Sequence, residues 1–168
     1  MEYCPDGDLF NYYKKRRDIS VSEILNFFKQ IVQAFIVLNG KGVIHRDLKP
    51  ENILLGKGSL IKIADFGSAR SVNKQGMSKA QNFSLDKGTP IYAAPQLLMN
   101  EKYSGKCDVW SAGCLLYFIY FRQHPFMDKK IHNTLNLIKK RTENRKIDLP
   151  KNTNTAVAKI LTLTLVFE

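Results

Sequence analysis

Candidate chemistry lies in two short polar loops that read HRDLKPEN and DFG, with apolar runs between them. Transfer of a phosphoryl group needs metal ions to neutralise its oxygens, a carboxylate to orient the attacking hydroxyl, and a nearby cation. Asp47 suits the carboxylate role and Lys49 the cation. Asn52 and Asp65 offer the oxygen ligands that Mg²⁺ prefers. The pattern therefore predicts phosphoryl-transfer chemistry.

A long helix is predicted before the first loop, over residues 20–41. Ser20 and Glu23 have the spacing of a capping box, and apolar residues recur at helical intervals until Gly40. We interpret this segment as a core helix that supports the loops.

A hairpin is predicted between the two loops. The apolar runs at residues 53–55 and 60–63 are short enough for strands, and GKGS joins them. Residues 68–87 then turn polar with little periodicity, which predicts an exposed, mobile and functional loop.

The second half of the chain predicts further helices, so the expected fold class is α+β, mainly α. The stretch 108–121 is almost wholly apolar and predicts a helix buried on all sides. Residues 131–140 and 156–166 are two amphipathic helical candidates.

Composition predicts one soluble globular unit. The 168 residues are 44% hydrophobic and 24% charged, and no apolar run approaches the length that crosses a bilayer. Cys4, Cys107 and Cys114 lack disulfide or zinc spacing and are expected to be free thiols. With no signal peptide at the start, the expected compartment is the cytoplasm, with the nucleus as the alternative.

The net charge of +11 favours acidic partners. The run KKRR at residues 14–17 could be a nuclear-localisation or nucleic-acid patch, but the preferred interpretation is a solvated helix face. Nucleic-acid binding ranks well behind the chemistry of the loops, because no known module accompanies the charge.

Taken together with GTPIYAAP further on, the two loops resemble the catalytic core of eukaryotic protein kinases of the serine/threonine type. The resemblance implies that Asp47 is the catalytic base, Lys49 contacts the phosphate, and Asn52 and Asp65 bind Mg²⁺. It implies transfer of the γ-phosphoryl group of Mg-ATP to Ser or Thr hydroxyls of protein substrates. No membrane partner is expected.

The same resemblance places the nucleotide. The backbone of Glu2 and Cys4 would face adenine, Asp8 would lie near the ribose, and Leu54 would form the floor under the adenine ring. Met1 would occupy the gatekeeper position.

Residues 65–96 would form the activation segment. Arg46 and Arg70 could face a phosphate on this loop, with Ser84 as the candidate acceptor and an upstream activating kinase as a partner. Thr89 resembles the threonine that bridges the base and the lysine. The alternative is that the serines are solvated loop residues; weaker acceptor candidates are Ser71 and Ser78.

Three further residues are expected to support the loops. Asp108 resembles the aspartate that holds the backbone of the catalytic loop, and His45 would stack with Phe66. Simple core packing is a compatible interpretation of this ring pair.

Glu51 is placed at the nucleotide and substrate site. With Asp8 it could favour substrates that carry arginine before the acceptor, although Phe118 stands where another acid would add to this preference.

The sequence departs from the family pattern at Gln96, where a glutamate is usual. The resemblance also covers only the C-terminal lobe: residues 1–8 would be the interlobe hinge and residues 9–168 the lobe. We therefore expect either a fragment of a longer kinase or an inactive, truncated kinase-like scaffold or binding module. Leu9, Leu54 and Phe66 would be an exposed apolar patch.

Overall fold

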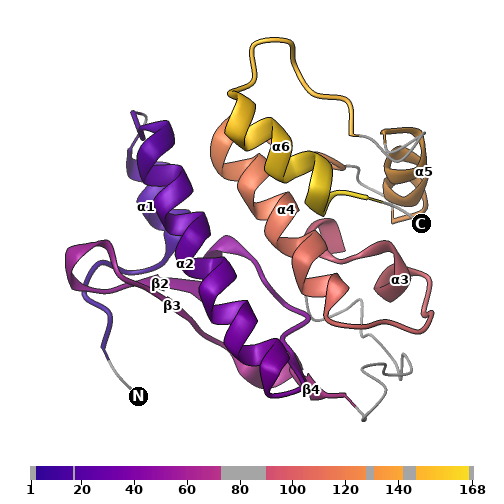
Figure 1. Ribbon diagram of the computed structural model, residues 1–168, viewed down its shortest axis with the longest axis horizontal. Helices are drawn as coiled ribbons and strands as arrows, with labels where there is room; N and C mark the ends of the chain where they lie inside the picture. The colour runs from indigo at the N-terminus through magenta and orange to yellow at the C-terminus, as the bar shows by residue number, and fades with distance from the viewer. Residues whose placement is uncertain (1–2, 17, 73–89, 128–130, 142–146, 167–168) are drawn as a thin grey trace.

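The computed structural model describes residues 3–16, 18–72, 90–127, 131–141 and 147–166. It is mainly helical, with two small sheets (Figure 1). The α-helices are α1 (Leu9–Lys15), α2 (Val21–Gly40), α3 (Pro95–Leu98), α4 (Lys106–Phe121), α5 (Ile131–Arg141) and α6 (Thr155–Thr164). The strands are β1 (Val43–Ile44), β2 (Ile53–Leu55), β3 (Ile61–Ile63) and β4 (Arg70–Ser71), and short 3-10 helices include η1 (Pro50–Asn52), η3 (Phe66–Ser68) and η5 (Pro90–Tyr92).

Helix α4 is the centre of the hydrophobic core. It packs against α2 and against α6, which runs beside it in Figure 1. Most of its side chains are buried, including Trp110, Leu115 and Leu116. The predicted helix is therefore confirmed and begins two residues earlier, at Lys106. It is not buried on all sides, since Val109 is 40% exposed. The amphipathic candidates are also confirmed, as α5 and α6.

Helix α2 begins where its cap predicts. The hydroxyl of Ser20 accepts a hydrogen bond from the Glu23 backbone N–H at 3.1 Å. The first half of the helix buries its apolar residues, but Ile36 and Val37 in the second half are 66% and 56% exposed. The core-helix interpretation is wrong for this second half, because Val32 and Ile36 line a surface groove between α2 and α4.

The same helix corrects the expectation about membrane-spanning length. Val21–Gly40 is long and apolar enough, by length and composition alone, to cross a membrane. The sequence contains no unbroken apolar run here, since Glu23 and Lys29 interrupt it. A core helix of a soluble protein passes the same test, and Phe27, Phe28 and Ile31 are buried against the rest of the protein.

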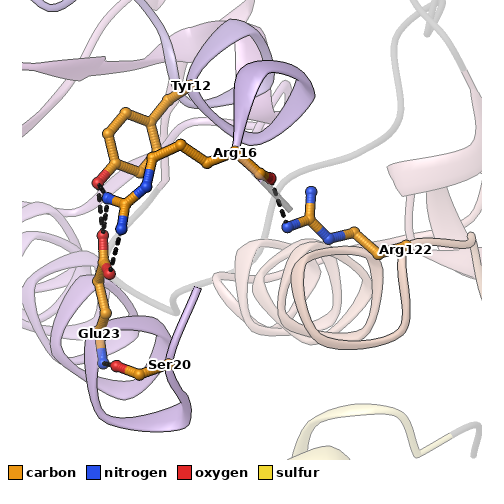
Figure 2. Close-up of polar contacts among 5 residues, drawn as sticks. All are labelled: Tyr12, Arg16, Ser20, Glu23 and Arg122. Carbon is orange, nitrogen blue, oxygen red and sulfur yellow. Dashed lines mark hydrogen bonds and ion pairs between the residues drawn. The ribbon is translucent and has the colours of Figure 1, made fainter. Parts of the chain in front are cut away.

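A polar cluster joins α1, α2 and α4 (Figure 2). The Arg16 guanidinium donates to the Glu23 carboxylate at 2.9 Å and also contacts the Tyr12 hydroxyl. At the end of α4, Arg122 donates to the Arg16 carbonyl at 2.8 Å and to the Tyr13 carbonyl at 2.6 Å. Glu23 therefore uses its carboxylate between helices rather than only as a capping residue.

This cluster changes the interpretation of KKRR. Lys14 and Lys15 lie exposed in the last turn of α1, as a solvated face requires. Arg16 instead forms the C-cap of α1 and an ion pair with Glu23. Its placement follows from contacts with residues outside the basic run, so the run alone does not predict it.

The predicted hairpin is confirmed. Strands β2 and β3 pair antiparallel, with Ile53 opposite Ile63 and Leu55 opposite Ile61. A second pairing, between β1 and β4, was not predicted: Ile44 lies opposite Arg70. These strands are two residues long, which is too short for an alternating pattern to be recognised. Part of the expected loop is therefore a strand, and most of the remainder lies outside the described residues.

The packing of α4 on α6 depends on Gly113. A Cβ atom at this position would lie 2.5 Å from Thr164 Oγ1 and 2.8 Å from Leu165 Cδ2. We expect Gly113→Ala to lower the free energy of unfolding by about 1–3 kcal/mol, because overpacking outweighs the better helix propensity of alanine.

Gly40→Ala is the matched control for that substitution. A Cβ atom at Gly40 would meet nothing within 4 Å, so this variant should be neutral or slightly stabilising. Denaturant unfolding of both variants measures the difference, and equal stabilities would contradict the close-packing argument.

Candidate active site

The first polar loop gathers three of the predicted residues around Asp47. Lys49 Nζ lies 2.9 Å from Asp47 Oδ2. The side-chain amide of Asn52 donates to the Asp47 carbonyl at 2.8 Å and to Asp47 Oδ2 at 3.2 Å. Lys49 and Asn52 can meet the same carboxylate because η1 turns the chain tightly between them, beginning at a proline. The loop therefore brings a carboxylate, a cation and an amide together in one place.

Asp108 holds this loop from the head of α4. Its two carboxylate oxygens accept hydrogen bonds from the backbone N–H groups of His45 at 2.8 Å and Arg46 at 2.9 Å. Burial raises the pKa of Asp108, and the two backbone hydrogen bonds partly offset this effect. The predicted contact between Asp108 and the catalytic loop is thus present.

The backbone at Arg46 explains why such a clamp is needed. Its φ of 66° lies in the left-handed region, which costs a non-glycine residue about 1–2 kcal/mol. This conformation brings two successive N–H groups toward one carboxylate. The hydrogen bonds to Asp108 offset the strain and fix the chain directly before Asp47.

The second polar loop is tied to the first through Ala64. The Ala64 N–H donates to the Asn52 carbonyl at 2.9 Å, and the Ala64 carbonyl lies 3.0 Å from His45 Nε2. Asp65 follows Ala64 directly in the chain, so the backbone next to Asp65 is tied to the first loop. The predicted contact of His45 with Phe66 is also present, with ring centroids 5.0 Å apart.

The residues present fit a magnesium ion with nucleotide phosphates. Asn52 turns its amide nitrogen toward Asp47, which leaves its carbonyl oxygen available as a ligand. Asp65 is exposed, and Oδ1 accepts a hydrogen bond from the Gly67 N–H at 3.2 Å. Amide and carboxylate oxygens are the donors that Mg²⁺ accepts. Within the described residues no cluster of three His, Cys, Asp or Glu side chains could hold a different metal.

The expected adenine and ribose residues are partly described. Leu54 is half-buried in β2 and pairs with Asp8 in an isolated antiparallel bridge, so these two candidates lie together. The carboxylate of Asp8 accepts hydrogen bonds from the backbone and side-chain nitrogens of Asn11, at 2.8 and 2.7 Å, so it caps α1. Cys4 is half-buried, while Glu2 and Met1 lie outside the described residues.

The two arginines predicted to bind phosphate, Arg46 and Arg70, lie in different environments. Arg46 is buried, and its guanidinium donates to the Ser68 carbonyl at 2.7 Å and the Tyr103 hydroxyl at 3.0 Å. Arg70 is exposed on β4 and donates to the Ala69 carbonyl. In this conformation Arg46 is therefore occupied by protein groups. Thr89 and the acceptor candidates Ser84 and Ser78 fall outside the part of the chain that the structure describes, whereas Ser71 is exposed on β4.

The predicted apolar patch is only partly present. Phe66 is 46% exposed and Leu54 half-buried, but Leu9 is fully buried because α1 packs onto η1 and β2. Glu51 is exposed on η1. Gln96 is half-buried in α3, where its carbonyl accepts a hydrogen bond from the Glu101 N–H.

Two residues near the site were missed by sequence reasoning. Tyr103 holds Arg46 through its hydroxyl and its ring. His124 is buried against Tyr92, with ring centroids 4.9 Å apart. Neither lies in a recognised motif, and their partners are 57 and 32 positions away in the chain, so no local signal marks them.

The buried His124 should make the free energy of unfolding depend on pH. Burial lowers the pKa of His124 to about 3, from its ordinary value of 6.5. Between these values the unfolded chain binds a proton that the folded protein excludes. The free energy of unfolding should therefore fall as pH is lowered, by about 2 kcal/mol between pH 7 and pH 5 from this residue alone.

His124→Asn supplies the comparison, because its side-chain oxygen can replace Nδ1 as the acceptor for the Phe126 N–H. Denaturant unfolding at several pH values should show a shallower pH dependence for this variant. The raised pKa of Asp108 makes the free energy of unfolding rise as pH is lowered, which opposes the effect of His124. This contribution is the same in the wild type and in His124→Asn. Identical pH profiles would contradict a neutral, buried His124.

The mainly helical fold and the two joined loops define a protein-kinase-like fold. The chain matches the family described as Protein kinase domain over residues 1–167. It therefore belongs to the protein kinase family.

Curated relatives agree with this assignment. The chain is 40% identical over 141 residues to 3-phosphoinositide-dependent protein kinase B of Dictyostelium discoideum, covering 84% of the chain and 16% of that protein. It is 38% identical over 136 residues to serine/threonine-protein kinase Nek5 of Mus musculus, covering 79% and 21%. It is 35% identical over 170 residues to serine/threonine-protein kinase ULK1 of Homo sapiens, covering 96% and 16%. The chain thus spans 16–21% of the length of these relatives.

Proposed function

We propose that the protein is a serine/threonine protein kinase that uses Mg-ATP as phosphoryl donor and protein hydroxyls as acceptors. The observation that carries this proposal is the grouping of Lys49 and Asn52 on the carboxylate of Asp47. The Asn52 carbonyl also accepts a hydrogen bond from Ala64, the residue before Asp65. The printed names of the relatives support the choice of serine and threonine as acceptors.

Each side chain has a distinct task in this proposal. The oxygen of the substrate hydroxyl bonds to the γ-phosphorus while the bond from that phosphorus to the leaving ADP oxygen breaks. Asp47 takes the proton that this hydroxyl loses. Lys49 lies beside Asp47 and stabilises the negative charge of the group in transfer. Asn52 and Asp65 would hold the magnesium ion, which would supply positive charge against the phosphates. Thr89 is assigned to bridge the base and the lysine.

The finer assignments are also proposals. Residues 1–8 correspond to the hinge between lobes, residues 9–168 to the C-terminal lobe, and residues 65–96 to the activation segment. An upstream kinase would act on Ser84, and the compartment would be the cytoplasm or the nucleus. Peptide mapping of the endogenous protein, captured with an antibody to α5 or α6, tests the lobe assignment. Upstream peptides with a glycine-rich loop and a lysine-bearing strand would support it.

The activity is tested with the purified endogenous or full-length protein. With Mg-ATP we expect phosphate incorporation on peptides with Ser or Thr acceptors and none on matched Tyr peptides. EDTA should abolish transfer, and Mg-ATP should raise the thermal unfolding temperature relative to Mg²⁺ alone. Absence of both transfer and Mg-ATP protection would overturn the kinase proposal and favour a kinase-like scaffold.

A further inference from the structure

Arg122 ends α4 in a backbone conformation that favours glycine. Its φ of 59° and ψ of 20° lie in the left-handed region, and its backbone N–H donates to the Phe118 carbonyl at 2.9 Å. Glycine adopts this conformation freely, whereas a Cβ atom makes it less favourable. The end of the helix therefore does not by itself require an arginine, so the contribution of Arg122 lies in its side chain.

The Arg122 guanidinium holds the last turn of α1. It donates to the Tyr13 carbonyl at 2.6 Å and to the Arg16 carbonyl at 2.8 Å, and its Cζ atom lies 4.6 Å from the centroid of the Tyr13 ring. Carbonyls at the C-terminal end of a helix lack partners within the helix, and a cation there is favourable. Two donors on one planar group fix both the position and the direction of this helix end.

Glu23 holds the same end of α1 from α2 (Figure 2). The Arg16 side chain donates to the Glu23 carboxylate at 2.9 Å, while the Arg16 carbonyl accepts from Arg122. Arg16 therefore connects a residue of α2 with a residue of α4. The C-terminal end of α1 is thus tied to both of the long helices.

The other end of α1 lies at the proposed nucleotide site. Asp8 caps the helix and forms a bridge with Leu54, the residue assigned to the floor under adenine. The preceding Gly7 carbonyl accepts a hydrogen bond from the Leu55 N–H at 2.8 Å. A seven-residue helix is about 10 Å long and moves as one rigid element, so a shift of its last turn also displaces Asp8.

The catalytic loop has supports of its own. Although α1 packs onto η1, Asn52 within η1 is hydrogen-bonded to the Asp47 carbonyl. Asp108 holds the backbone before Asp47 from the head of α4. A shift of α1 should therefore alter the side of the site formed by Asp8 and Leu54 and leave Asp47 in place.

We infer that Arg122 is a positioning residue for nucleotide binding: it fixes α1, and through α1 it sets the places of Asp8 and Leu54. This inference rests on the proposed kinase function and gives a role in it to a residue outside the two polar loops. Arg122 acts on the nucleotide through the helix, without contact with the nucleotide itself.

The first experiment measures steady-state kinetics of the full-length protein at varied concentrations of Mg-ATP. Arg122→Gly removes the guanidinium and suits the left-handed backbone, so the end of α4 should persist. We expect KM for Mg-ATP to rise about 3- to 10-fold with little change in kcat, because the loss falls on nucleotide binding. Arg122→Asn is the second variant if Arg122→Gly unfolds, since asparagine also tolerates this conformation. An unchanged KM would overturn the inference, and a lowered thermal unfolding temperature would then leave Arg122 with a stabilising role only.

Three further variants separate the tie from its side effects. Asn100→Gly is the matched backbone control, because Asn100 also has a positive φ, of 58°, and is exposed after α3. Lys15→Ala removes a positive charge from the same end of α1, where Lys15 is exposed. Both should keep the wild-type KM. Arg122→Lys keeps the charge without the two-pronged donor, so its KM should lie between those of the wild type and Arg122→Gly. An equal rise in KM for Lys15→Ala and Arg122→Gly would assign the effect to charge alone and overturn the inference.

Hydrogen exchange and direct binding separate this inference from the kinase proposal. In the absence of nucleotide, Arg122→Gly should speed exchange of the Leu55 amide, which donates to Gly7. Isothermal titration calorimetry should show weaker binding of Mg-ATP to the same variant. Both results would support the inference even if no peptide is phosphorylated, an outcome that would reject the kinase function alone. Transfer with wild-type KM and wild-type exchange at Leu55 would reject the role of Arg122 alone.

Discussion

Replacing Asp47 with asparagine is expected to abolish measurable phosphoryl transfer. Loss of a positioned general base costs about 10²- to 10⁴-fold in rate. The substitution preserves shape and one oxygen, and the hydrogen bond from Asn52 to the backbone carbonyl of residue 47 does not depend on the carboxylate. The fold should therefore persist. Transfer rates with Mg-ATP, together with the thermal unfolding temperature, measure the two effects separately.

Asp148→Asn is the control for this charge change, because Asp148 is exposed between α5 and α6. It should leave transfer unchanged. An Asp47→Asn protein with full activity would remove Asp47 from the role of base. An inactive protein that is also unfolded would show that the side chain supports the loop rather than the chemistry.

Asp108→Ala should produce the largest loss of stability. The carboxylate of Asp108 is buried and is the acceptor for the backbone N–H groups of His45 and Arg46. Its removal leaves two buried donors unsatisfied and releases the strained backbone at Arg46, so we expect a loss of about 3–5 kcal/mol in the free energy of unfolding. Denaturant unfolding measures this loss, and phosphoryl transfer should fall with it because Asp47 follows directly.

Asp108→Asn distinguishes the acceptor role from simple packing. Asparagine keeps one oxygen acceptor but presents an amide group to the second N–H donor, so its stability should lie between those of the wild type and Asp108→Ala. Glu101→Ala, at an exposed acid, should have little effect. Equal stabilities for the alanine and asparagine variants would show that the two hydrogen bonds do not determine the conformation of the loop.

Contacts among neighbouring residues were predictable from the sequence. Asp47, Lys49 and Asn52 lie within six positions, and a single 3-10 turn brings them together. The cap at Ser20 and the apolar stretch of α4 depend likewise on local pattern. Local geometry limits the conformations of such short stretches, so residue type and spacing were enough to predict these elements and the candidate catalytic set.

The tertiary structure decided which distant residues share an environment. Asp108 meets His45 across 63 positions, and Arg122 meets Tyr13 across 109. Packing of α1 buries Leu9, which the sequence resemblance placed on the surface. It also places Arg16, a member of the basic run KKRR, in an ion pair with Glu23. It also brought Phe10 beside Phe118 at the edge of a groove. The sequence by itself determined the family and the local arrangement of the polar loops. The partners that hold those loops, and the groove beside them, depend on how the helices pack, which no local pattern records.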